Sequence, residues 1–282
     1  MKNILVPTDF SNDAYNALFY ITQLLKDTHC TFHILNCYDE KTKVLTKKRG
    51  EPNEKELPNA LRVDSKEGLV KTKHRIVLDT GHENHSFESI SKKDDLTKTV
   101  AKLVKDLQID LVVMGNKGIT GAKDIFMGSN TTRVIHSGLA CPLLTIPKEI
   151  DFKIPKKLAL VTDYKYCIGA EQMDVIIDIA RISEATIRVM HINEKESLDK
   201  FETSNMNTLT KYLEEVDHSF HWMPKFSSKT EAIQLFLEEL EIDLLIMFNT
   251  EHSLMEKIFR EPVIKKITFD IELPFLVINL SQ

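Results

Sequence analysis

The sequence repeats itself, and an internal repeat constrains the fold of a protein more than any other feature. Three apolar blocks of the first half recur in the second half. They pair residues 4–10 (ILVPTDF) with 158–164 (LALVTDY), 109–114 (IDLVVM) with 242–247 (IDLLIM), and 142–146 (PLLTI) with 274–278 (PFLVI). We therefore expect two related domains, residues 1–150 and 151–282, joined near residues 148–155.

The first copy is longer than the second between its early and late blocks. The offset between paired blocks falls from 154 residues to 133, so the extra residues lie in between. Residues 40–75 are polar, rich in lysine and interrupted by Gly50, Pro52, Pro58 and Gly68, which is typical of a long surface loop. We interpret them as a solvated excursion, in preference to a charged surface for an acidic partner.

Within each copy, short apolar runs alternate with segments of helical periodicity. In residues 14–25 and 96–107, apolar side chains recur every three or four positions, and Ser11 or Asn12 is the expected N-cap of the first segment. Strand, helix, strand in repetition predicts an α/β fold of two tandem, doubly wound, five-stranded parallel sheets. The strands are expected at 3–7, 31–37, 74–78, 111–115 and 143–146, and at 157–161, 186–192, 220–223, 244–248 and 274–278.

Composition is typical of a soluble globular protein. Of 282 residues, 42% are hydrophobic and 28% are charged, and 37 Lys and Arg against 42 Asp and Glu give a net charge of −5. This balance argues against a nucleic-acid surface, which needs clustered positive charge. No apolar run is long enough to span a bilayer, and the first residues do not resemble a secretory signal. We therefore expect a cytoplasmic protein that binds neither membrane nor nucleic acid.

The thiols and imidazoles do not form a recognisable metal motif. The segment GHENH places His82 and His85 in a predicted loop, but it is not the helical HExxH zinc motif, so we expect no metal there. The four cysteines lack the spacing of a zinc site or a redox motif, and we expect buried thiols. These cysteines are Cys30, Cys37, Cys141 and Cys167.

Glycine is scarce, and its distribution indicates where a ligand binds. Five of the nine glycines, Gly115, Gly118, Gly121, Gly128 and Gly138, follow the fourth predicted strand. A glycine-rich loop that leads into a helix presents backbone N–H donors to an anion, for which phosphate is the natural ligand. Neither GxxxxGK[ST] nor GxGxxG is present, so the loop is neither a P-loop nor the dinucleotide fingerprint.

The spacing of these glycines resembles the ATP-binding motif of the universal stress protein family. Two residues separate Gly115 from Gly118, and nine separate Gly118 from the pair Gly128 and Ser129. The opening PTDFS, the run LVVM before Gly115 and the closing CPLLTI fit the same family. The resemblance covers nearly the whole sequence as a tandem pair. It implies an adenine nucleotide alpha hydrolase-like fold, with ATP over the carboxyl ends of the first and fourth strands.

For single residues, the resemblance implies an ATP site, with or without Mg²⁺, in the first domain. Asp9 would hydrogen-bond adenosine through its carboxylate, with Pro7 and Thr8 beside it. Cys37, at the end of the second strand, would touch adenine. Met114 would lie beside the ribose.

The same resemblance implies that the phosphates lie over the glycine-rich loop. Gly115 would flank the ribose and phosphates, and Lys117 is a weaker candidate for a phosphate contact. Backbone or hydroxyl donors would come from Gly118, Gly128, Ser129, Asn130 and Thr131.

Several of these residues also have an interpretation without a ligand. Asp9 could cap the helix that starts near Asn12. Met114 and Cys37 could be core residues. Gly121 and Gly138 are expected to serve only a turn and a helix end.

The second copy has lost the glycine motif. A phenylalanine in place of a glycine would fill the space of a ribose, two carboxylates would repel phosphate, and a proline removes an N–H donor. We therefore expect no nucleotide in the second domain. The replacements are Gly115 by Phe248, Gly118 by Glu251, Gly128 by Glu261 and Ser129 by Pro262.

In the family the last strands of two domains pair, which implies an intramolecular pseudo-dimer here, with residues 143–146 and 275–278 as the paired strands. Covalent fusion would make the second domain a built-in partner, and a further homodimer stays open. The sequence favours an ATP-binding regulator of a stress response over an efficient enzyme, because no water-orienting base accompanies the loop. Nucleotide would order residues 116–127 and signal to a protein partner that the sequence does not identify. The alternatives are a nucleotide-independent scaffold with a vestigial motif and a slow ATPase.

Overall fold

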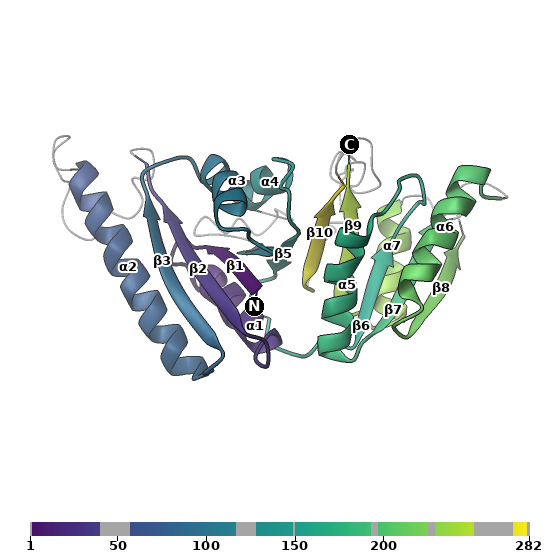
Figure 1. Ribbon diagram of the computed structural model, residues 1–282, viewed down its shortest axis with the longest axis horizontal. Helices are drawn as coiled ribbons and strands as arrows, with labels where there is room; N and C mark the ends of the chain where they lie inside the picture. Colours follow the sequence, from purple (N-terminus) through teal and green to yellow (C-terminus); the bar gives the residue numbers. More distant parts are fainter. Residues whose placement is uncertain are drawn as a thin grey trace. The chain divides into compact units, whose positions relative to one another are not determined.

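The computed structural model describes residues 2–39, 57–116, 128–148, 150–192, 197–224, 229–250 and 273–280. The protein divides into two compact units, Met1–Ile150 and Asp151–Gln282 (Figure 1). Five parallel strands and their connecting helices make up each unit. None of the helices described in these ranges is both long enough and apolar enough to cross a bilayer.

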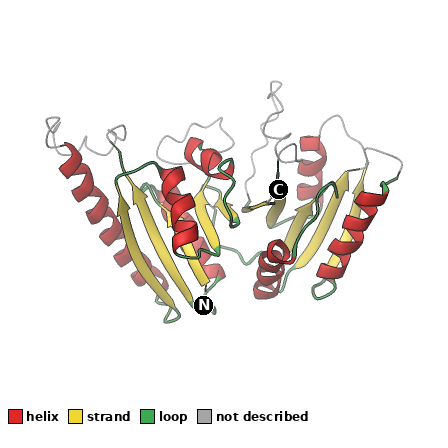
Figure 2. Ribbon diagram, turned by 45° about the horizontal axis from the view of Figure 1, so that its top comes forward, coloured by secondary structure: helices red, strands yellow, loops and turns green. Residues whose placement is uncertain are grey.

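The first unit is a parallel sheet with helices on both faces (Figure 2). Its strand order is β3-β2-β1-β4-β5, so the polypeptide winds outward from β1 in one direction and then returns to wind in the other. Helices α1 and α2 pack together on one face, while α3 packs against β1 and α4. The elements are β1 (Lys2–Pro7), α1 (Asn12–Leu24), β2 (Cys30–Cys37), α2 (Leu57–Thr80), β3 (His85–Lys92), α3 (Leu96–Asp106), β4 (Leu111–Gly115), α4 (Ser129–Ile135) and β5 (Leu143–Ile146).

The second unit repeats this topology. Its strand order is β10-β9-β6-β7-β8, the order of the first unit when it is read from β8, and every strand pair within it is parallel. The elements are β6 (Lys157–Val161), α5 (Ala170–Ser183), β7 (Thr186–Ile192), α6 (Lys200–Leu213), β8 (His218–Met223), α7 (Lys229–Glu239), β9 (Leu244–Asn249) and β10 (Phe275–Asn279). The predicted tandem α/β fold with parallel sheets is confirmed.

The central strands form the core of each sheet. Ile4, Leu5 and Val6 of β1 are fully buried, as are Val112 and Val113 of β4. A strand that is covered on both faces needs apolar residues without alternation, because side chains on either face meet a helix layer. The unbroken apolar runs of the sequence therefore predict these strands correctly.

One predicted strand and one predicted loop are wrong. Residues 74–78 belong to α2, which also includes residues 57–75 of the expected excursion; residues 40–56 lie outside the described part of the sequence. Helix α2 buries Leu61, Leu69 and Ile76 along one side, and the third strand follows it as β3. The other predicted strands agree to within about two residues at each end.

The thiols differ from the prediction in part. Cys30 and Cys141 are buried, Cys37 is half-buried and Cys167 is exposed. All four cysteines are free thiols. Gly138 has a φ of +65° two residues after the C-cap of α4, which is the left-handed conformation expected of a residue that ends a helix.

Candidate functional site

The turn between β1 and α1 holds Asp9 through short-range hydrogen bonds. The N–H of Phe10 donates to Thr8 Oγ1 over 3.0 Å, and the N–H of Ser11 donates to Asp9 Oδ1 over 3.0 Å. Ser11 is the N-cap of α1, because its hydroxyl accepts from the N–H of Ala14. The helix cap is thus Ser11, and one oxygen of Asp9 stabilises the turn before it.

Phe10 adopts a left-handed backbone conformation, with a φ of 63°. Its ring lies against Gly68 of α2, where a Cβ would approach three ring carbons at 2.5 to 2.7 Å. A glycine in the middle of a helix is destabilising by propensity alone. Here its lack of a side chain allows α2 to contact the turn that carries Asp9.

The ladder register brings three of the predicted adenosine contacts together. Pro7 pairs with Leu35, two positions before Cys37, and the register of β1 on β4 places Pro7 beside Met114. Side chains at alternate positions of a strand share a face. Pro7, Cys37 and Met114 therefore lie on one face at the carboxyl ends of β1, β2 and β4, where the strand order reverses. Open α/β sheets bind ligands at such a reversal.

The thiol of Cys37 is a neutral surface at physiological pH. Burial raises its pKa to about 11, and the side chain of Thr99 on α3 offsets part of this rise. A thiol with such a pKa carries no charge that would repel a phosphate nearby. Its half-buried position suits contact with a base as well as a role in the core.

Gly115 has a packing reason to be glycine. A Cβ at this position would lie 3.0 Å from the carbonyl carbon and oxygen of Asp13 in α1. The carbonyl of Gly115 also accepts a hydrogen bond from Thr131 Oγ1 in α4 over 3.0 Å. The close approach of α1 to β4 therefore favours glycine at this position even without a ligand.

The two ends of the glycine-rich loop are tied together. The N–H of Gly128 donates to the carbonyl of Asn116 over 2.6 Å, and the N–H of Asn116 donates to the carbonyl of Ile146 over 2.8 Å. Lys117 and Gly118 lie outside the described residues, as does Gly121. Their predicted roles stay predictions.

Helix α4 begins immediately after Gly128, and its first-turn N–H groups have no acceptor within the helix. Ser129 and Asn130 are exposed, while Thr131 is buried against β4. This arrangement leaves the start of α4 accessible at the end of the loop.

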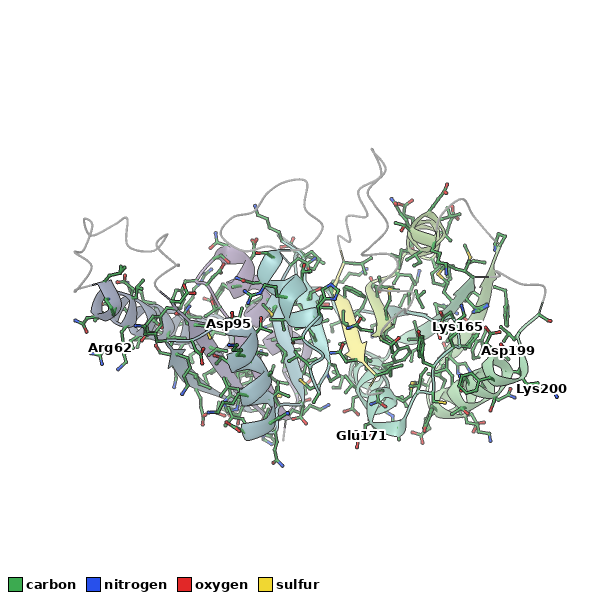
Figure 3. All side chains as sticks on the ribbon, turned by 90° about the horizontal axis from the view of Figure 1, so that it is seen from above. Arg62, Asp95, Lys165, Glu171, Asp199 and Lys200 are labelled. Atoms are coloured by element: carbon green, nitrogen blue, oxygen red, sulfur yellow. The ribbon has the colours of Figure 1, made fainter. Side chains whose placement is uncertain are left out.

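An ion pair joins α4 to α3. Arg133 donates to Asp95 Oδ2 over 2.6 Å. Asp95, labelled in Figure 3, is the N-cap of α3, where its Oδ1 accepts from the N–H of Lys98. The hydrogen bond from Arg133 is the main reason that the pKa of Asp95 lies below its ordinary value.

The second unit repeats the turn at the level of single hydrogen bonds. The N–H of Tyr164 donates to Thr162 Oγ1 over 3.1 Å, and the N–H of Lys165, labelled in Figure 3, donates to Asp163 Oδ1 over 3.2 Å. Tyr164 has a φ of 57°, close to that of Phe10 in the first unit. The sequence match of the two Thr-Asp segments is therefore a match of structure.

The two units differ next to this turn. Phe248 stands where the first unit has Gly115, and α5 begins at Ala170, later than the offset of 154 from Asn12 would place it. Phe248 lines a pocket of about 20 Å³ with Ile168, Tyr166 and other residues. That volume holds about one water molecule. Of the other replaced positions, Glu251, Glu261 and Pro262 lie outside the described residues.

The sequence reasoning missed two asparagines at the strand ends of the first unit. Asn36, after Leu35 of β2, donates from Nδ2 to the carbonyl of Thr8 over 2.7 Å. The second unit uses His191 in the same way, with Nδ1 3.1 Å from the carbonyl of Thr162. The other asparagine is Asn116, directly after β4. A polar residue at the end of a buried strand is the pattern that could have identified both asparagines.

No metal centre is apparent in the described part of the sequence. Within those residues, no group of three or more His, Cys, Asp or Glu could hold an ion. The rings of His82 and His85 contact each other edge to face, with centroids 5.0 Å apart.

Two doubly wound parallel sheets define an α/β protein of the kind that binds ligands at the carboxyl edge of its strands. The model of the universal stress protein family matches residues 1–147, and the chain belongs to this family. A universal stress protein from Archaeoglobus fulgidus DSM 4304 is similar in structure, with a TM-score of 0.68 and 13% identity over 99% of this chain and 98% of that chain. A protein of unknown function from Pseudomonas aeruginosa PAO1 has a TM-score of 0.58 and 14% identity over 99% and 92%. These likenesses show the fold. No curated protein matches the sequence.

Proposed function

We propose that the first unit binds ATP at the carboxyl ends of β1, β2 and β4, and that the second unit binds no nucleotide. The protein would act in the cytoplasm as a nucleotide-dependent regulator of a stress response. Membership of the universal stress protein family supports nucleotide binding in general. The choice of ATP and of a single site goes beyond family membership.

The shared face of Pro7, Cys37 and Met114 is the observation that carries this proposal. In this proposal a base would cover an uncharged, mainly apolar patch beside the turn of Asp9, in which Cys37 is half-buried and Pro7 and Met114 are buried. The backbone N–H groups that follow Gly128 lie beyond the carboxyl end of β4, because the N–H of Gly128 bonds to the carbonyl of Asn116. The strand order reverses between β1 and β4. Donors of this kind suit phosphate oxygens.

The second unit supports the proposal that only the first unit binds nucleotide. Its Thr-Asp turn is intact, but Phe248 stands beside it where the first unit has Gly115. In this proposal the second unit keeps the framework without the ligand, and it serves the first unit as a covalently attached partner.

A matched pair of substitutions tests the site. Asp9→Asn and Asp163→Asn change the same atom of the same turn in the two units. In equilibrium titrations with labelled ATP, with and without Mg²⁺, we expect Asp9→Asn to weaken binding at least tenfold and Asp163→Asn to leave it unchanged. Gly128→Glu, which copies the second unit, should abolish binding. Equal effects of the two asparagine variants would contradict the proposal, and no binding by the unsubstituted protein would favour a nucleotide-independent scaffold.

A further inference from the structure

Asn116, which directly follows β4, has a buried side chain. The residue is 4% exposed. Within the described ranges, which omit residues 117–127, its Oδ1 has no hydrogen-bond partner. A buried polar atom without a partner is rare in folded proteins, because it loses its hydrogen bonds to water and gains none in return. Such an atom points to a missing donor.

The internal repeat provides a direct comparison. Asn249, the last residue of β9, occupies the matching position, and its Nδ2 donates to Asn279 Oδ1 over 2.6 Å. In the first unit the pairing of β4 with β5 places Pro147 where the second unit has Asn279. Proline has no polar side-chain atom, so the contact that Asn249 makes through its Nδ2 has no counterpart at Asn116, where the atom without a described partner is the amide oxygen.

The backbone shows which face Asn116 occupies. Its N–H continues the β4–β5 ladder by donating to the carbonyl of Ile146, so the alternation of side chains along β4 extends to it. Asn116 therefore shares the face of Met114, which is also the face of Pro7 and Cys37.

Asn116 also lies beside the start of α4, because its carbonyl accepts from the N–H of Gly128 over 2.6 Å. Asn116 thus lies between the end of β4, which carries Met114, and the start of α4, whose N–H groups we propose for phosphate. The sugar is the part of a nucleotide that joins base to phosphate, and its hydroxyls are hydrogen-bond donors. Phosphate oxygens at neutral pH only accept hydrogen bonds, so they do not satisfy an amide oxygen.

We propose that Asn116 Oδ1 accepts a hydrogen bond from a sugar hydroxyl of the bound nucleotide and makes the site prefer ATP to the deoxy analogue that lacks this hydroxyl. This inference rests on the proposed function. A site built to bind a hydroxyl rejects an analogue that lacks it, because its own buried polar atom is then left without a partner. We expect a preference of roughly ten- to a hundredfold for ATP over the deoxy analogue that lacks the bonded hydroxyl.

The test compares the affinities of the full-length protein for ATP, 2′-deoxy-ATP and 3′-deoxy-ATP by equilibrium titration. Asn116→Leu has a similar size and removes the amide, so we expect it to weaken ATP binding to the level of the deoxy analogue and to abolish the preference. Asn116→Asp keeps an acceptor oxygen and should retain the preference, although its charge weakens the binding of all three nucleotides. Asn249→Leu is the matched control in the second unit and should leave all three affinities unchanged.

Two results would overturn the inference. The unsubstituted protein could bind ATP and both deoxy analogues equally, or Asn116→Leu could weaken all three nucleotides by the same factor, as a purely structural residue would. Either result leaves ATP binding itself intact. If the unsubstituted protein binds none of the three, the proposed function fails and the inference fails with it. Should Asn116→Leu not fold, the titrations of the unsubstituted protein and of Asn116→Asp still decide the question.

Discussion

Gly68 of α2 lies against the ring of Phe10, so that a Cβ at position 68 would be 2.5 Å from the ring. This contact joins a helix that is far away in the sequence to the turn that holds Asp9. The helix can lie this close to the turn only because residue 68 has no side chain.

Gly68→Ala should therefore destabilise the protein. Alanine gains about 1 kcal/mol over glycine in a helix, but forcing a methyl group into a packed contact costs about 1–3 kcal/mol. We expect a net loss of about 1 kcal/mol, measured as a lower midpoint of urea unfolding. In a Phe10→Ala background the same change should stabilise the protein, since the ring is gone. A rise in stability when Phe10 is present would contradict the contact.

The pair of Asp95 and Arg133 should make stability depend on pH in a defined direction. The pKa of Asp95 is lowered mainly by its hydrogen bond from Arg133. Because the pKa of Asp95 is lower in the folded state, its ionised carboxylate stabilises the fold above the ordinary pKa of about 4. This stabilisation is lost as the pH falls through the lowered value.

Asp95→Asn tests this dependence, because asparagine still caps a helix but carries no charge. The pair is partly exposed, so we expect a loss of no more than about 1 kcal/mol at pH 7. Urea unfolding should show this difference shrinking as the pH falls through the lowered pKa of Asp95. Asp95→Ala should keep a deficit at low pH, because the cap is lost as well. A pH-independent effect of Asp95→Asn would contradict the role of charge.

The four thiols should react at very different rates. Burial raises the pKa of Cys30 to about 11 and that of Cys141 to about 12, and Cys37 is similar at about 11. At pH 8 only about a thousandth of a thiol with a pKa near 11 is ionised, and the thiolate is the reactive form. Cys167 is exposed.

We therefore expect one fast-reacting thiol per native molecule with a disulfide reagent, and Cys167→Ser should remove that phase. All four thiols should react at once in denaturant. A fast phase that survives in Cys167→Ser would show that another cysteine is more accessible than its burial indicates.

The repeat allowed most of the fold to be predicted from the sequence. The exception is the third strand of the first unit, and it has a physical cause. Along α2, Val77 is 46% exposed and Leu78 is 69% exposed, although both are apolar. They lie next to buried Ile76 and form a short run that resembles a strand. The true third strand, β3, buries only Phe87 among its eight residues, so its polar sequence lacks the apolar run that identifies a central strand.

The site residues named from the sequence stay predictions, and the structure shows only where they lie. Asp9, Cys37 and Met114 lie at or just after the ends of buried strands, and the register then determines that Cys37 and Met114 share a face. Gly115 was interpreted as a ligand position, whereas its packing against Asp13 depends on where α1 lies, which a motif does not encode. Asn116 lies beside Pro147, and its amide oxygen has no partner among the described residues; such relationships become visible only when the strands are paired and packed.

The number of ATP molecules bound per protein molecule tests the account most directly. Equilibrium dialysis of the full-length protein against labelled ATP at saturating concentration should give a stoichiometry near one, and Gly128→Glu should reduce it to near zero. A stoichiometry near two, or one binding site that survives Gly128→Glu, would contradict the claim that the first unit holds the nucleotide and the second does not.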